Sequence, residues 1–203
     1  MILSVGCLLV AWTACGHKKT PEDYAPVLDS IRRAEAAKQL LPPKVSDPVD
    51  AWFDSLQLIS LPIRYSVSFV EYLPQMSKVP APFNSRFDYE PNIKLEAARL
   101  PSAGHHRMVL LAEHVDSLTT TVYLCSMSPD YVLQDRLCLY EQKIEDRDGR
   151  LGLMRQEYFV TSNYEVTLVT FFRAEDEEDD TLEGTVRYTV DQEGNFQEAV
   201  IEL

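Results

Sequence analysis

The stretch from Arg107 to Tyr140, RMVLLAEHVDSLTTTVYLCSMSPDYVLQDRLCLY, decides the fold of this chain. It contains three apolar or alternating runs, at 107–115, 120–127 and 132–140. Runs of this kind predict strands, and the groups between them, Asp116-Ser117 and Ser128-Pro129-Asp130, have the composition of turns. Consecutive strands joined by short turns pair antiparallel. The stretch therefore predicts the start of a β-meander.

The same pattern continues to the C-terminal end of the sequence. Further strands are expected at 157–161, 164–173, 184–190 and 196–203, separated by turn chemistry at Asp148-Gly149, Ser162-Asn163 and Glu193-Gly194-Asn195. We therefore expect residues 107–203 to form a curved, mainly antiparallel β-sheet of about six or seven strands.

Residues 26–58 are predicted to be largely helical. Apolar residues at helical spacing follow Pro26, and Pro42-Pro43 ends that first helix. Asp47-Pro48 has the features of the N-terminus of a second helix, with Asp47 as the N-cap and Pro48 at the first helical position. The fold class expected for residues 26–203 is therefore a single α+β domain in which N-terminal helices pack on the sheet.

Between the helices and the meander the prediction is less regular. The alternation of Ile63–Phe69 predicts a strand. Prolines recur through residues 70–104, so we expect an ordered but irregular stretch there, with short helical turns.

The N-terminus has the features of a secretion signal. Residues 1–14, MILSVGCLLVAWTA, are apolar but too short to span a bilayer as a helix. Trp12-Thr13-Ala14-Cys15 resembles the lipobox of bacterial lipoproteins, which implies a lipid on Cys15 and a tether over residues 15–25. A plain secretion signal with an unmodified Cys15 is the alternative, and Cys7 leaves too short a leader to be the modified residue.

Three segments of the chain resemble uncharacterised envelope lipoproteins of the Bacteroidetes. Trp52-Phe53 followed by Leu56–Ile63 is similar to their aromatic and Leu-Pro entry, Tyr123–Leu137 to their central hairpin, and Tyr188–Phe196 to their closing hairpin. The turn of the central hairpin departs from their usual Asp-x-x-Gly. That group has no established activity, so the resemblance implies a class and a location only. The basic rather than acidic residues after Cys15 favour the periplasmic face of the outer membrane.

The net charge argues against nucleic-acid binding, and the cysteine positions argue against a disulfide. The formal net charge is −13, which repels nucleic acid. Cys125 and Cys138 remain once Cys7 and Cys15 are assigned to the leader and the anchor. A tight turn would place Cys125 opposite about Gln134 and leave Cys138 too far along its strand for a disulfide, so two core thiols are expected.

No motif of catalysis or cofactor binding stands out. Adjacent His105 and His106 would point in opposite directions, and Glu113, His114 and Asp116 offer too few convergent ligands for a metal. The acidic run 175–183 is expected to be a solvated loop, with loose Ca²⁺ or a basic partner as alternatives. The residues from Asp146 fail the pattern of a calcium loop. We expect no catalytic residue, metal or cofactor.

The sequence thus predicts a lipid-anchored protein of the bacterial cell envelope that binds a partner or supports an assembly without intrinsic catalysis. Its expected contacts are the membrane, through the lipid, and a protein or a glycan. Two alternatives stay open: a hydrolase acting on envelope or dietary polymer, and a glycan- or peptide-binding module.

Overall fold

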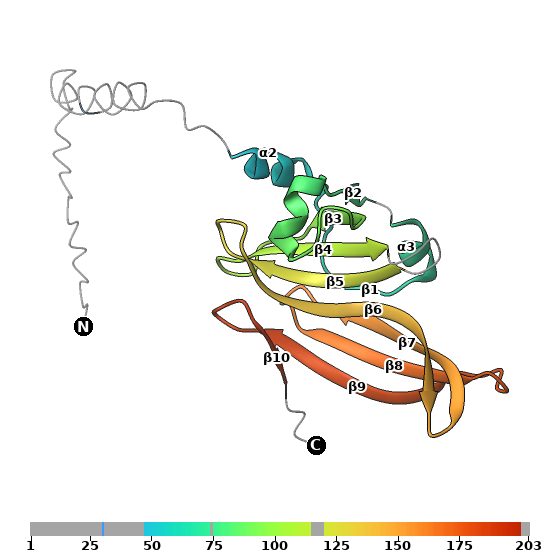
Figure 1. Ribbon diagram of the computed structural model, residues 1–203. Helices are drawn as coiled ribbons and strands as arrows, with labels where there is room; N and C mark the ends of the chain where they lie inside the picture. The colour runs from blue at the N-terminus through green and yellow to red at the C-terminus, as the bar shows by residue number, and fades with distance from the viewer. Residues whose placement is uncertain (1–29, 31–46, 74, 115–119, 200–203) are drawn as a thin grey trace, which may run out of the picture. The chain divides into compact units, whose positions relative to one another are not determined.

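The computed structural model describes residues 30, 47–73, 75–114 and 120–199 (Figure 1). The chain divides into two compact units, Met1–Ser46 and Asp47–Leu203, and the second contains nearly all the described residues. Cys15, the predicted helix from Pro26 and the turn at Asp116-Ser117 lie outside the described residues.

The second unit is mainly β rather than the predicted α+β, because its described helices are few and short, while the predicted antiparallel sheet is confirmed. Within the described residues the sheet has ten strands, in the order β10-β9-β8-β7-β6-β5-β4-β3-β2, with β1 paired to β7 off this path. Their bounds are β1 (Ile63–Arg64), β2 (Ser77–Lys78), β3 (Leu95–Arg99), β4 (Arg107–His114), β5 (Thr120–Met127), β6 (Leu133–Arg147), β7 (Arg150–Val160), β8 (Val166–Ala174), β9 (Thr181–Val190) and β10 (Phe196–Glu198).

The estimate of six or seven strands was too low because β1, β2 and β3, which lie before Arg107, also belong to the sheet. Residues 70–104 contain β3, which pairs with β4 along its whole length, in addition to the expected helical turns. Of the predicted strand Ile63–Phe69, only the first two residues pair, with Val160 and Phe159. The rest enters helix α3 (Val67–Tyr72), because the Ser66 hydroxyl accepts the backbone N–H of Phe69 and caps it.

β6 is the strand on which the sheet folds over. Its first half pairs with β5 up to Tyr140, and its second half pairs with β7 from Glu141 onward. The Asp148-Gly149 turn has positive φ at both residues, which suits a two-residue hairpin and lets β6 and β7 run on to Arg147 and Arg150. Both strands are therefore longer than predicted, and Figure 1 shows them bending across the molecule.

The main core lies between the two halves of the folded sheet. It joins residues of β3–β6, such as Leu110 and Leu124, to residues of β7 and β8, such as Val160 and Val166, all fully buried. The backbone N–H of Phe196 in β10 donates to Asp135 Oδ2 at 2.7 Å, so the last strand is held against β6. One end of the meander is thereby brought next to its beginning.

The opposite face of β3–β5 is covered by α2 (Pro48–Ser55) and the 3-10 helix η2 (Ala81–Phe87). The predicted cap is confirmed, since Asp47 Oδ1 accepts the Val49 N–H at 3.0 Å and Pro48 occupies the first turn. Val49 and Phe53 are buried against the sheet. Helices therefore cover one face of this half, as expected, although those described are few and short.

The cysteine prediction is confirmed in its outcome but not in its register. Cys125 is buried, Cys138 is half-buried, and both are free. Cys125 pairs with Arg136 rather than with Gln134, because the turn leaves Met127 opposite Leu133 and a β-bulge between Ser126 and Met127 shifts the ladder by one more residue.

Candidate functional site

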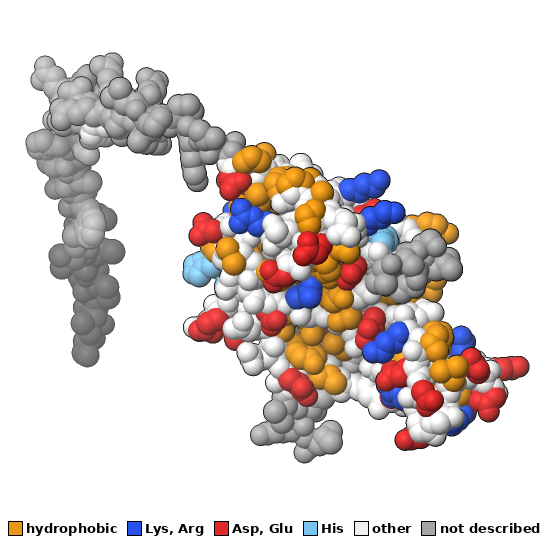
Figure 2. Space-filling view, in the orientation of Figure 1, with side chains coloured by type: hydrophobic (Ala, Val, Ile, Leu, Met, Phe, Trp, Pro, Cys, Tyr) orange, Lys and Arg blue, Asp and Glu red, His pale blue; other side chains and the backbone are white. Residues whose placement is uncertain are grey.

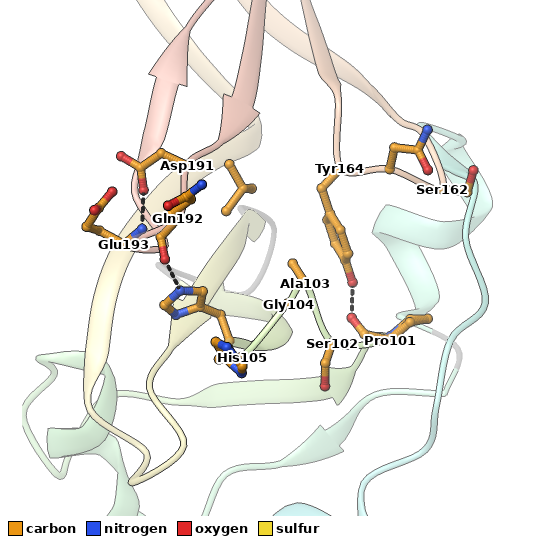
Figure 3. A pocket seen from close by; sticks show the side chains of 13 residues that line it. Pro101, Ser102, Ala103, Gly104, His105, Ser162, Tyr164, Asp191, Gln192 and Glu193 are labelled. Atoms are coloured by element: carbon orange, nitrogen blue, oxygen red, sulfur yellow. Dashed lines mark hydrogen bonds between the residues drawn. The ribbon is translucent and has the colours of Figure 1, made fainter.

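Three turns that are far apart in sequence meet at one end of the folded sheet. They are the loop 101–106 between β3 and β4, the turn 161–165 between β7 and β8, and the turn 191–195 between β9 and β10. Together they line a cavity of about 880 Å³, which we call the three-turn pocket (Figure 3). A volume of this size is typical of small-molecule sites.

Local hydrogen bonds shape two of these turns. Asp191 Oδ1 accepts the backbone N–H groups of Glu193 at 3.0 Å and Asn195 at 2.8 Å. The bonds with Asn195 lower the pKa of the Asp191 carboxyl, since they stabilise its ionised form. In the second turn, Thr161 Oγ1 accepts the N–H groups of Asn163 and Glu165. Both turns are therefore fixed by their own first residue.

Two long-range hydrogen bonds join the turns to the loop 101–106. His106 Nε2 donates to the carbonyl of Gln192 at 3.0 Å, and the Tyr164 hydroxyl donates to the carbonyl of Pro101 (Figure 3). Because a carbonyl only accepts, the ring proton of a neutral His106 lies on Nε2. Burial raises the pKa of Tyr164, so its hydroxyl remains a donor. The pocket is thus organised by the protein itself.

The floor beneath the turn 191–195 holds two buried polar atoms without a hydrogen-bond partner among the described residues, His106 Nδ1 and Ser126 Oγ. Gly194 separates them: a Cβ at Gly194 would lie 2.7 Å from each atom. This close approach is one reason why the position requires glycine. Its φ of +88°, which side-chain-bearing residues rarely adopt, is a second reason.

The open side of the pocket carries polar side chains, and Glu193 adds an exposed carboxylate beside them. Ser102, His105, Asn163 and Gln192 line it and are exposed. Among the described residues, no hydroxyl of this lining is hydrogen-bonded to a histidine or a carboxylate, which is the arrangement that activates a nucleophile. The arrangement can bind and orient a polar ligand, but it offers no activated group.

The histidine pair singled out from sequence reaches this pocket, but the two rings differ in role. His106 is half-buried and ties two turns together, whereas His105 is exposed on the rim. The turns Ser162-Asn163 and Glu193-Gly194-Asn195 were predicted one by one. Their meeting was missed, because it depends on how the sheet folds over and leaves no periodic signal.

The other residues considered as ligands do not converge. Glu113 accepts a hydrogen bond from the Tyr89 hydroxyl at 2.8 Å, while His114 Nε2 lies 3.9 Å from Glu96 Oε1. Asp116 is outside the described residues. Across 47–73, 75–114 and 120–199 there is no group of three or more His, Cys, Asp or Glu side chains that could hold a metal ion.

The acidic run 175–183 is exposed throughout, and residues 175–180 form the loop between β8 and β9, as expected; ion pairs tie part of it to β7. Arg150 Nη2 lies 2.6 Å from Glu177 Oε1, and Arg155 Nη2 lies 2.9 Å from Asp180 Oδ2. Figure 2 shows acidic and basic side chains interspersed at this end of the sheet. Part of the run is therefore paired to β7.

Comparison with known proteins finds no matching family model, no matching curated protein and no matching solved structure. In the part of the chain that the structure describes, none of the helices has the length and apolarity needed to cross a membrane.

Proposed function

We propose that this protein is a lipid-anchored, non-catalytic binding protein of the bacterial cell envelope, and that the three-turn pocket holds a neutral glycan. The anchor rests on the lipobox-like sequence at Cys15 and on the resemblance to envelope lipoproteins, which also favours the periplasmic face of the outer membrane. The binding role rests on the pocket.

The observation that carries the proposal is that hydrogen bonds within the protein organise the pocket. The bonds from His106 to Gln192 and from Tyr164 to Pro101 fix three loops against each other. A site that is already ordered loses less conformational entropy when a ligand binds. Loops held on a rigid sheet are also where binding residues concentrate.

The chemistry of the lining favours a neutral, hydroxyl-rich ligand. Ser102, His105, Asn163 and Gln192 offer donors and acceptors from exposed side chains. The apolar side chains of Pro101, Ala103 and Val190 lie among them and suit the C–H faces of a sugar. A neutral ligand also avoids repulsion from a protein of net charge −13.

The same lining argues against hydrolysis at this pocket. A glycosidase needs one carboxyl that donates a proton and a second that acts as base or nucleophile. Two carboxyls line the pocket. Asp191 is occupied by the backbone of its own turn, and its lowered pKa makes it a poor proton donor, while Glu193 is exposed two residues along the same turn. Binding is therefore favoured over the hydrolase alternative.

The test is a screen of neutral oligosaccharides against the purified mature protein, followed by calorimetry with the best binder. Asn163→Ala should weaken that binder about fivefold to tenfold, the usual effect of losing one hydrogen bond. Asn92→Ala is the matched control, since Asn92 is exposed and does not line the pocket. If no neutral glycan binds, or if both variants bind equally well, the pocket is not a glycan site.

A further inference from the structure

A second cavity lies on the other side of the sheet fold, between α3 and the strands β6–β8. It has a volume of about 810 Å³, and we call it the α3 groove. Its lining comes from α3 and the segment before it, from the facing ends of β4 and β5, and from β6, β7 and β8. None of its residues lines the three-turn pocket.

Three cationic side chains line the groove of this otherwise acidic protein: Lys143, Arg155 and Arg173. Arg155 is paired with two carboxylates, since its Nε lies 3.0 Å from Glu157 Oε1 and its Nη2 lies 2.9 Å from Asp180 Oδ2. It serves the structure rather than a ligand.

The other two cations retain free donors. Within the described residues, the side chain of Arg173 makes no hydrogen bond, and its ion-pair contact is a long one, 4.0 Å from Nε to Asp180 Oδ1. Lys143 uses one of its three donors, on Glu141 at 3.4 Å. Their side chains are 40% and 49% exposed. Lys143 pairs with Met154, whereas Arg173 pairs with Leu153, so the two side chains point to opposite faces of the sheet and Arg173 is the one that can meet an anion beside Leu153.

Apolar side chains stand next to these cations. Val67 on α3 is 56% exposed and Ile144 on β6 is 63% exposed, although both line the groove. Leu153, the cross-strand partner of both Ile144 and Arg173, lies between them. A ligand that covers this surface would bury apolar area beside an anion site.

The remaining lining is polar. Gln142, Thr120 and Glu71 supply amide, hydroxyl and carboxylate groups, and the stacked rings of Tyr65 and Tyr140, with centroids 5.4 Å apart, form part of the wall. A long acyl chain needs a lining that is apolar throughout, whereas a peptide brings backbone N–H and C=O groups that polar side chains can match.

We infer that the α3 groove binds a peptide segment that presents a carboxylate next to an apolar side chain. The carboxylate is held by Arg173, whose planar guanidinium can donate two parallel bonds. The apolar side chain packs against Ile144, Leu153 and Val67. The carboxylate can be the free end of a peptide or an acidic side chain, and both offer the same chemistry.

The inference is tested by fluorescence anisotropy with three labelled hexapeptides of otherwise identical sequence. One ends in leucine with a free α-carboxylate, the second is its C-terminal amide, and the third is the amide with glutamate before the leucine. Binding of the first or the third, but not the second, supports the inference and identifies the source of the carboxylate. Binding of all three equally, or of none, overturns it.

Variants locate the binding to the groove. Arg173→Gln should weaken the bound peptide about tenfold or more, as expected for a lost charge-assisted bond, while Arg173→Lys should retain part of the affinity. Arg187→Gln is the matched control, because Arg187 is exposed on β9 and does not line the groove. Each variant is first compared with the wild type by circular dichroism and thermal melting. An unchanged affinity in a folded Arg173→Gln protein would contradict the inference.

Asn163→Ala should leave peptide binding unchanged, so that failure of the glycan proposal and failure of the peptide inference can be told apart.

Discussion

Gly194 shows how much a single residue contributes to the three-turn pocket. It has φ of +88°, and a Cβ at this position would lie 2.7 Å from His106 Nδ1 and from Ser126 Oγ. The sequence marked Gly194 only as part of a turn. Its second constraint, the contact with a side chain 88 positions away in the chain, depends on the fold and has no local signal.

Replacement of Gly194 by alanine should therefore destabilise the protein by about 2–3 kcal/mol, of which about 1 kcal/mol comes from the left-handed backbone and the rest from the contact. Gly149→Ala is the matched control, since its φ is +81° but nothing lies within 4 Å of its Cβ position. Gly149→Ala should cost about 1 kcal/mol. Urea unfolding of both variants measures the difference, and equal losses would mean that the Gly194 contact does not matter.

Asp191 makes the stability of the same turn depend on pH. Its carboxyl has a lowered pKa in the folded protein, so the unfolded chain takes up the proton first as the pH falls. The stabilisation by Asp191 is present above the ordinary carboxyl value of 3.8 and is lost as the pH falls through the folded pKa. Asp191→Ala should therefore melt at a lower temperature than the wild type at pH 7, and the gap should narrow below pH 3.8. A gap that is independent of pH would show that the charge of Asp191 is not involved.

At the scale of elements, the strands after Arg107 could be predicted because the turns between them contain characteristic turn-forming residues. Ser128-Pro129-Asp130, Asp148-Gly149 and Glu193-Gly194-Asn195 all lie where turns were expected. The errors fell where two signals compete. Ser66-Val67-Ser68-Phe69 alternates as a strand does, yet Ser66 caps a helix, and the capped helix is what forms. β3 was missed because prolines on both sides masked a five-residue strand.

The β5–β6 hairpin gives a chemical test of its packing. Burial raises the pKa of the Cys125 thiol to about 12, and burial likewise raises that of the half-buried Cys138 to about 12. Since the thiolate is the reactive form, neither residue should be alkylated by iodoacetamide at pH 7.5 in the folded protein. Both should react in denaturing urea, as peptide mapping by mass spectrometry would report. Rapid alkylation of Cys125 in native buffer would contradict the buried position on β5.

At the scale of the molecule, the folded sheet explains why neither cavity could be predicted. The three-turn pocket forms because β10 lies beside β6, where the Phe196 N–H donates to Asp135. The α3 groove forms because α3 lies beside β6–β8. Lys143, Arg155 and Arg173 lie on three strands without any common spacing. Sequence patterns report on nearest neighbours along one element, and these sites arise between elements.

The lipid that we propose on Cys15 would hold the protein at a membrane, where glycans and peptides of the envelope are within reach of a tethered protein. Tethering raises the effective concentration of such ligands, so modest affinities would suffice.

Metabolic labelling with an alkyne fatty acid tests the central claim most directly. Cells producing the full chain should yield labelled protein in the membrane fraction, and Cys15→Ala should abolish the label and release the protein from that fraction. Label that persists in Cys15→Ala, or a wild-type protein that carries none, would contradict the lipid-anchored envelope protein described above.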